Sequence, residues 1–302
     1  MSASVLFDTP GPRTRRRSRI ASVIVVVLIA AGLAWVVYTL AQPRDSSGIT
    51  LPGYFDASRW DIFVLAELWV RIGGGLLATL QAAAVAAAMA LVIGVLFAML
   101  RTSVHAAVRI PATIVLEFFR GMPVLLMMLF ILLVASTGAF WAVVLALGVY
   151  NGAIIGESLR AGLAALPRGQ REAGLSLGLT RLQTKTFIEF PQAFRQMLPV
   201  IIAQLVVLLK DTSLGYIVGY NELIRTTMNN LGSSVGNRYL FSLFLVTLVI
   251  YLAVNLSLSA VARRVARRRS PGKILAKDQI TPTASISALG APTRNPEDRT
   301  TE

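Results

Sequence analysis

Residues 165–199 read ALPRGQREAGLSLGLTRLQTKTFIEFPQAFRQMLP and form a polar stretch between two apolar spans. Gly178 stands where a glycine can adopt positive φ and end a helix. Thr180, with Gln183 three residues later, predicts a capping box at the start of a second helix. Pro191 and Pro199 are expected to end that second helix. We therefore expect two short helices, joined by a turn, that project from the membrane.

This stretch resembles the EAA loop of the membrane subunits of bacterial ATP-binding-cassette (ABC) importers, which usually reads Glu-Ala-Ala, then Gly, then Ile-x-Leu-Pro. Here Gly174 replaces the second Ala, at the third position of the motif, and Phe190 replaces the Leu. Gly174 is still small and Phe190 is still bulky and apolar. The resemblance implies a coupling loop that binds in a groove of the ATPase subunit. The alternative is an ordinary amphipathic connector. The coupling residues implied are Gly169, Gln170, Glu172, Ala173, Gly174, Gly178, Ile188 and Pro191.

The composition is that of a polytopic membrane protein. Of 302 residues, 55% are hydrophobic and only 15% are charged, and the mean hydropathy is +0.66. A soluble domain of this length would need far more polar surface. The chain has no cysteine and one histidine, His105, which excludes a disulfide framework, a thiolate metal site and a multi-histidine metal cluster.

Six apolar runs are long enough to cross a hydrocarbon core of about 30 Å. We therefore predict an all-α protein with six transmembrane helices and no strand, and the resemblance implies the type I permease fold of ABC importers. The predicted spans are 20–41, a helix within 72–100, 111–135, 139–163, 197–220 and 239–262.

The basic residues favour one orientation of these spans. With the N-terminus in the cytoplasm, 19 Lys and Arg residues as far as Lys277 lie on the inner side and five lie outside. The positive-inside rule then places both termini and the Glu172 loop in the cytoplasm. The net charge of +14 is explained by this asymmetry, without nucleic acid as a partner. The run 20–41 is longer than a signal-peptide core and is predicted to be an uncleaved anchor.

These patterns divide the chain into five parts. They are a basic cytoplasmic tail (1–19), an extra N-terminal transmembrane helix (20–41), an external linker (42–71), a permease core (72–262) with the coupling loop at 165–196, and a basic, disordered cytoplasmic tail (263–302).

Charged residues inside the predicted spans are candidates for the substrate path, because a charge in hydrocarbon must face protein or water. Glu117 and Arg120 can pair on one helix face, and Glu157 and Arg160 repeat that spacing. Neutralised pairs that merely permit insertion are the alternative. Adjacent Lys210 and Asp211 cannot share a face, and with the hydroxyls and glycine after them they suggest a broken helix lining a cavity. Polar contacts between helices are the alternative for this cluster. The candidates are Glu117, Arg120, Tyr150, Asn151, Lys210, Asp211, Thr212 and Ser213.

Four motifs in order are similar to the branch of ABC permeases that serves polar amino acids (histidine, arginine, glutamine, glutamate and opines). They are EFFRGMP (117–123), GQREA (169–173), FPQA (190–193) and LKDTSL (209–214). Overall, the chain is most like actinobacterial glutamate permease subunits. Residues 149–153, VYNGA, depart from the Gly-Ala-Tyr run common in the family.

The resemblance implies an ATP-driven importer of glutamate, or of glutamine, arginine or histidine, in the bacterial cytoplasmic membrane. The implied partners are an ATPase dimer that carries ATP and Mg²⁺, a sister permease or second copy of this chain, an extracytoplasmic binding protein, and membrane lipid. Among the residues there is no catalytic set, metal site or phosphate-binding loop, so we expect a translocation subunit without cofactor rather than an enzyme. An ATP-independent secondary transporter is the competing class, although no inverted repeat is evident.

Overall fold

The computed structural model describes residues 11–46 and 49–268, and the predicted all-α class is confirmed for them. One small hairpin departs from the prediction of no strand. Strand β1 (Arg44–Ser46) pairs antiparallel with β2 (Ile49–Leu51), with Asp45 opposite Thr50. Strands of three residues are too short to show the alternating pattern by which strands are recognised.

Five helical segments of the described residues are long and apolar enough to cross a membrane. They comprise α1 (Pro12–Ala41), α2 (Ala66–Arg101), α5 (Ala139–Ala164), the continuous segment Arg181–Tyr216 that contains α8 (Phe190–Asp211), and α10 (Leu240–Arg268). Helix α10 continues past the predicted end at residue 262. The predicted C-terminal tail otherwise lies outside the described residues, as does the predicted tail before residue 11.

The predicted span 111–135 is wrong as a single helix. It is two helices, α3 (Ala106–Gly121) and α4 (Val124–Ala135), which meet at an angle of 100°. Pro123 causes the break, because a residue before proline is driven out of the helical region. Met122 accordingly has φ −82° and ψ 131°. The sixth predicted crossing exists only if this bent pair counts as one span.

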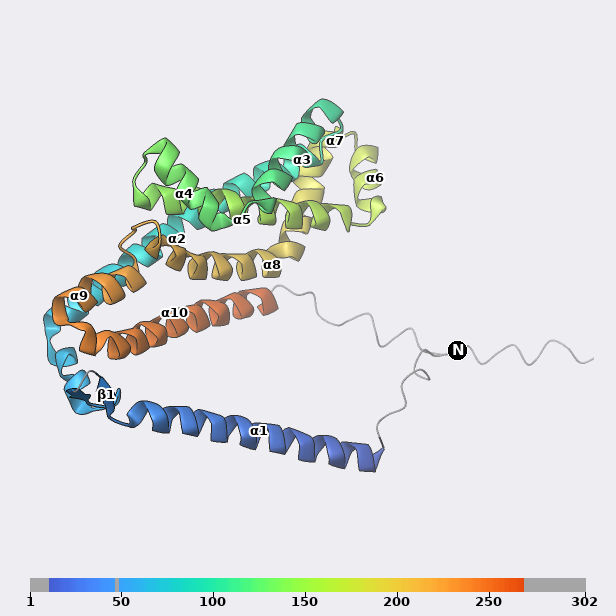
Figure 1. Ribbon diagram of the computed structural model, residues 1–302. Helices are drawn as coiled ribbons and strands as arrows, with labels where there is room; N and C mark the ends of the chain where they lie inside the picture. Colours follow the sequence, from blue (N-terminus) through green and yellow to red (C-terminus); the bar gives the residue numbers. More distant parts are fainter. Residues whose placement is uncertain (1–10, 47–48, 269–302) are drawn as a thin grey trace, which may run out of the picture.

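Helices α2, α5 and α8 form the centre of the bundle (Figure 1). Small residues on α2 recur at helical spacing, and Ala82, Ala86 and Ala90 have no exposed surface. Small side chains allow helix backbones to approach closely, which is how helices associate in membranes without a hydrophobic driving force. Helix α5 is the most enclosed span, with 61% of its apolar window buried.

Helix α1 stands apart from this bundle (Figure 1), and none of its apolar window is buried. Its end is fixed through the linker. The linker contains two 3₁₀ segments, Ala57–Arg59 and Asp61–Val64. The buried side chain of Arg59, the last residue of the first segment, donates hydrogen bonds to the carbonyl oxygens of Pro52 (2.9 Å) and Arg238 (2.7 Å). Tyr54 and Phe55 pack on the Phe241 ring of α10.

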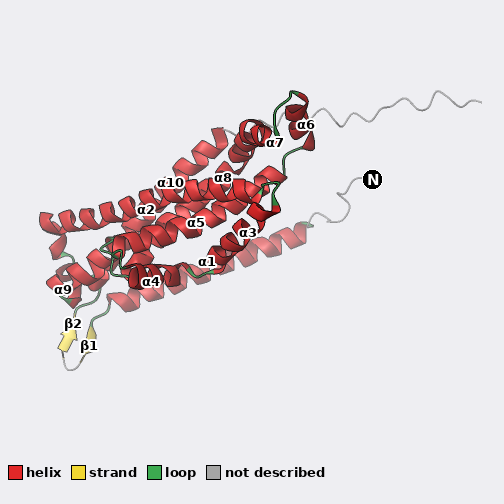
Figure 2. Cartoon of the chain, turned by 90° about the horizontal axis from the view of Figure 1, so that it is seen from above, coloured by secondary structure: helices red, strands yellow, loops and turns green. Residues whose placement is uncertain are grey.

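The bundle has two distinct ends (Figure 2). One carries the β hairpin and, between α8 and α10, a π-helix (Arg225–Leu231), α9 (Gly232–Val235) and a 3₁₀ turn (Asn237–Tyr239). The other carries α6 (Arg168–Ser176) and α7 (Arg181–Gln183). The polar stretch singled out in the sequence therefore projects from one end of the bundle.

Candidate functional site

The turn at Gly178 has the predicted form. Gly178 has φ +80°, and two backbone hydrogen bonds close the helix. The Gly178 N–H donates to the Leu175 carbonyl (3.0 Å), and the Leu179 N–H donates to the Gly174 carbonyl (3.3 Å). This pair of bonds is the Schellman motif, which satisfies carbonyls at a helix C-terminus. The predicted capping box is also present, with Thr180 and Gln183 bonded reciprocally.

The prediction that a second short helix follows the turn is wrong. Helix α7 continues through a π-helix (Thr184–Glu189) directly into α8, so the chain forms one rod from Arg181 towards Tyr216. Pro191 and Pro199 do not end a helix. Pro191 lies where the π-helix passes into α8, so its missing N–H falls at a point where the regular α-helical hydrogen-bond ladder is already interrupted, and Pro199 lies inside α8. Only α6 is a separate projecting helix.

Helix α6 packs closely on this rod. A Cβ atom at Gly174 would lie 2.6 Å from Thr184 Cγ2 and 2.9 Å from Ile188 Cδ1. The glycine that replaces the family's alanine therefore permits a contact that alanine could not make without displacement. The buried carboxylate of Glu189 accepts a hydrogen bond from Arg171 Nε at 2.7 Å. This hydrogen bond raises the pKa of the Arg171 guanidinium.

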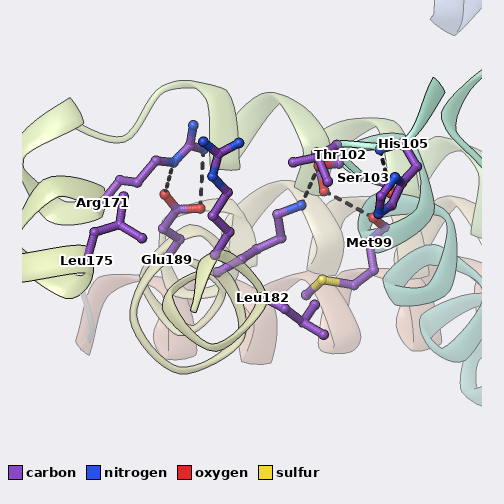
Figure 3. Close-up of a pocket in the computed structure, with 11 residues that line it drawn as sticks. Met99, Thr102, Ser103, His105, Arg171, Leu175, Leu182 and Glu189 are labelled. Carbon is purple, nitrogen blue, oxygen red and sulfur yellow. Dashed lines mark hydrogen bonds and ion pairs between the residues drawn. The ribbon is translucent and has the colours of Figure 1, made fainter. Parts of the chain in front are cut away.

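The central part of the predicted coupling loop, residues 168–192, is called the coupling segment below. A cavity of about 500 Å³ lies between it and the end of α2 (Figure 3). Met99, Thr102 and His105 line one wall, and Arg171 and Glu189 line the other. Lys185 crosses between the walls and donates to the Thr102 carbonyl oxygen. Lys185 thus ties this segment to the end of α2.

Four large apolar side chains of the coupling segment are exposed, and three of them, Leu177, Leu182 and Phe187, are exposed over most of their surface. The exposed fractions of these three side chains are 80%, 70% and 70%. Sequence reasoning did not single them out, although apolar residues inside a polar projecting segment are a signal. Exposed apolar groups rimmed by polar residues mark protein contact sites. Gly169, Gln170, Glu172, Ala173 and Pro191, predicted for coupling, are exposed beside them, whereas Ile188 is half-buried.

The charged pairs of the third and fourth predicted spans belong to one network. Arg120 lies 3.2 Å from Glu117, and Arg160 lies 2.6 Å from Glu157, as the spacing predicts. Arg101, the last residue of α2, joins the two pairs by contacting both carboxylates. Sequence reasoning missed this role, because Arg101 is 16 residues from Glu117 and 56 from Glu157.

Asn151 belongs to a separate polar contact between α5 and α8. It is fully buried and accepts a hydrogen bond from Gln204 Nε2 at 2.8 Å. Its own amide donates to the Leu147 carbonyl oxygen. Tyr150, its neighbour, is half-buried against the core. The contact satisfies Asn151 within the protein.

The helix changes its winding after Asp211 but does not break there, because the segment Arg181–Tyr216 is continuous. Helix α8 ends at Asp211, and a 3₁₀ segment (Thr212–Tyr216) comes next. Thr212 is buried and donates to the Leu209 carbonyl oxygen (2.7 Å), whereas Asp211 and Ser213 are half-buried and Lys210 is exposed. No ion pair within residues 11–46 and 49–268 includes Lys210 or Asp211.

The structure does not gather these candidates into one site. Among the described residues, no hydrogen bond or ion pair connects the Glu117–Arg120 network, the Asn151 contact and the 210–213 segment. Within the same residues, no group of three histidine, aspartate or glutamate side chains could hold a metal ion.

A buried carboxylate that sequence reasoning missed lies after the 3₁₀ segment Thr212–Tyr216. Glu222 has no exposed surface. It accepts hydrogen bonds of 2.8 Å from the Ile224 and Arg225 N–H groups and from Tyr251 Oη on α10. It therefore caps the next helical segment and ties that segment to α10.

Comparison with known proteins gives concordant matches. Residues 90–271 match the family described as binding-protein-dependent transport system inner membrane component. The chain is 39% identical to the glutamate transport system permease protein GluD of Corynebacterium glutamicum, over 73% of this chain and 83% of that protein. It is 34% identical to the probable glutamine ABC transporter permease protein GlnP of Bacillus subtilis, over 68% and 95% of the two chains.

A solved structure agrees with these relatives. The crystal structure of an amino acid ABC transporter with histidines contains a chain that is 28% identical and superposes with a TM-score of 0.62. The superposition covers 69% of this chain and 98% of that one. All of the predicted coupling and substrate-path residues lie within the matched range 90–271.

Proposed function

The chain belongs to the family of binding-protein-dependent transport system inner membrane components, and from this premise we propose that it carries glutamate into the cell. It is a permease subunit of an amino-acid importer of the ABC type and not an enzyme. The support for glutamate is the 39% identity to a glutamate permease. Glutamine is the second candidate, because a probable glutamine permease is 34% identical.

The coupling segment is the proposed ATPase contact. Its three most exposed apolar side chains, Leu177, Leu182 and Phe187, offer the apolar centre that protein interfaces use, and Glu172 and Arg171 provide a polar rim. The partner ATPase binds ATP and Mg²⁺. Its closure moves α6, and the continuous rod from α7 into α8 passes the motion into the membrane.

The substrate path is proposed to lie between this chain and a sister permease or a second copy. Lys210 supports this placement, because a charged side chain in an apolar span must face water or protein, and Lys210 is exposed on the single chain. Glu117 and Arg120 are likewise 45% and 41% exposed. A second permease beside these groups would enclose them, and an extracytoplasmic binding protein would deliver the amino acid.

Transport assays test this function. Proteoliposomes that contain the chain, its ATPase and a glutamate-loaded binding protein should accumulate glutamate only with ATP. Lys210→Met should lower that uptake by roughly tenfold or more, because an anionic substrate loses its counter-charge in a dry site. Uptake by this chain alone would instead support a secondary transporter, and stronger inhibition by glutamine than by glutamate would reassign the substrate.

The double variant Lys210→Met with Asp211→Leu is the control for this substitution. If Lys210 serves only to balance Asp211, removal of both charges should restore uptake, because a lone buried charge is worse than none. We expect uptake to stay low in the double variant while the complex assembles and hydrolyses ATP. Recovery to the wild-type rate would remove Lys210 and Asp211 from the substrate path.

We also propose that both termini and the coupling segment face the cytoplasm, in agreement with the excess of basic residues on that side. The absence of cysteine from the chain makes a direct test possible. Leu177→Cys, at an exposed position of the coupling segment, should react with a membrane-impermeant maleimide in inside-out vesicles but not in intact cells. Ser58→Cys, in the linker, should show the opposite pattern. Labelling of Leu177→Cys in intact cells would reverse the topology.

A further inference from the structure

A basic cavity of about 290 Å³ lies beside the Arg101 network, at the end of the bundle that carries the coupling segment. Three helices supply one arginine each: Arg101 from the end of α2, Arg109 from the start of α3 and Arg160 from the last turns of α5. Thr113, Ile110 and Ile114 of α3 complete the wall. Arginines from three helices thus converge on one opening.

The charges around this cavity do not balance. Arg101, Arg120 and Arg160 share the two carboxylates Glu117 and Glu157. Arg109 forms no ion pair with any residue of 11–46 or 49–268. With four arginines and two glutamates, the cluster has two positive charges in excess, so an anion would be favoured there.

Two of the three arginines that line the cavity, Arg101 and Arg160, are held in place before any ligand arrives. Arg101 has only 9% of its side chain exposed, contacts both glutamates, and donates from Nε to Thr113 Oγ1 at 3.3 Å. Arg160 makes two hydrogen bonds to Glu157, at 2.6 and 3.0 Å. Fixed guanidinium groups suit phosphate, because their planar donors can bind two oxygens at once.

The apolar part of the wall indicates where the anion comes from. Ile110 and Ile114 are 55% and 64% exposed on the outer face of α3. Arg109 lies in the first turns of α3, and Arg101 lies at the end of α2. Guanidinium groups at the ends of membrane helices lie at the level of lipid headgroups, and the exposed isoleucines next to them suit acyl chains.

We propose that this cavity binds the phosphate group of an anionic phospholipid, with an acyl chain against Ile110 and Ile114. Basic pockets between transmembrane helices are known to bind such headgroups. The lipid phosphate supplies the negative charge that the cluster lacks. A bound lipid would hold α2, α3 and α5 together at the end of the bundle where the coupling segment acts.

Native mass spectrometry of the full-length chain in detergent tests the proposal. On titration with phosphatidylglycerol, one molecule should bind more tightly than phosphatidylcholine does. Arg109→Gln should weaken that binding by roughly fivefold, the value expected for one basic residue near a membrane surface. This substitution breaks no ion pair among the described residues, so the fold should persist, and an unchanged unfolding temperature would verify this.

Two controls separate the possible outcomes. Arg195→Gln, at an exposed position of α8, should leave the affinity for phosphatidylglycerol unchanged, and Arg109→Lys should retain most of it. Equal binding of the two lipids, or equal losses in the Arg109 and Arg195 glutamine variants, would overturn the proposal. Displacement of the lipid by millimolar inorganic phosphate would also overturn it, because the cavity would then be a site for a soluble anion.

Discussion

Gly178→Val should abolish ATP-driven uptake while the chain still inserts and assembles with its partners. Gly178 adopts φ +80° at the end of α6, a region that costs an L-residue about 1–2 kcal/mol and that a β-branched side chain avoids almost entirely. The two hydrogen bonds of the Schellman motif depend on this conformation. Without it α6 cannot keep its angle to α8, so ATPase motion is lost before it reaches the membrane.

The measurement is uptake per assembled complex in proteoliposomes, with ATP hydrolysis recorded in parallel. Gly178→Asn is the matched control, because asparagine tolerates the left-handed region and a side chain at this position meets open space. The asparagine variant should keep most of the uptake, whereas the valine variant should fall at least tenfold. Normal transport by assembled valine complexes would show that the turn does not couple the ATPase to the permease.

Glu222→Ala should produce the largest loss of stability in the chain. It removes the acceptor for two backbone N–H groups and the Tyr251 hydroxyl, all in a fully buried position. Each buried donor left without a partner costs about 1–3 kcal/mol, so the total is at least about 3 kcal/mol. In a chain of this size the unfolding temperature should fall by roughly 5 °C or more.

Thermal unfolding of the purified full-length chain measures this effect. Tyr251→Phe removes one of the three hydrogen bonds and should lower the unfolding temperature by a smaller amount. Glu222→Gln keeps an acceptor oxygen and should fall between the two. An unfolding temperature of Glu222→Ala within about 1 °C of the wild type would mean that water or a rearranged helix end replaces the carboxylate.

The sequence predicted the structure best where a feature depends on residues within a single turn or on one helix face. Gly178, the capping box at Thr180 and the pairs Glu117–Arg120 and Glu157–Arg160 depend on residues at most four apart. The prediction from proline was wrong at Pro191, because the π-helix Thr184–Glu189 just before it lets the rod continue through the proline. At Pro123 the same residue type broke a span that looked continuous.

The parts that could not be predicted are contacts between distant segments. Arg101 meets Glu157 across 56 residues, and Glu222 meets Tyr251 across 29. The reason for the glycine at 174 also appears only when α6 lies against Thr184. Such contacts depend on how the helices pack, and no spacing along the chain indicates them. The proposed coupling residues were accessible to motif reasoning because they lie within one short segment.

Because α1 is separate from the bundle, its presence changes the number of membrane spans without changing the packing of the other helices. None of its apolar window is buried, and Arg59 in the middle of the linker ties the linker to the Arg238 carbonyl oxygen. Each added span moves the N-terminus to the opposite side of a membrane. Loss of α1 would therefore transfer the start of the chain to the other compartment, and every contact within α2, α5, α8 and α10 would remain. Helix α1 therefore determines on which side of the membrane the N-terminus lies, and the packing of the other helices does not depend on it.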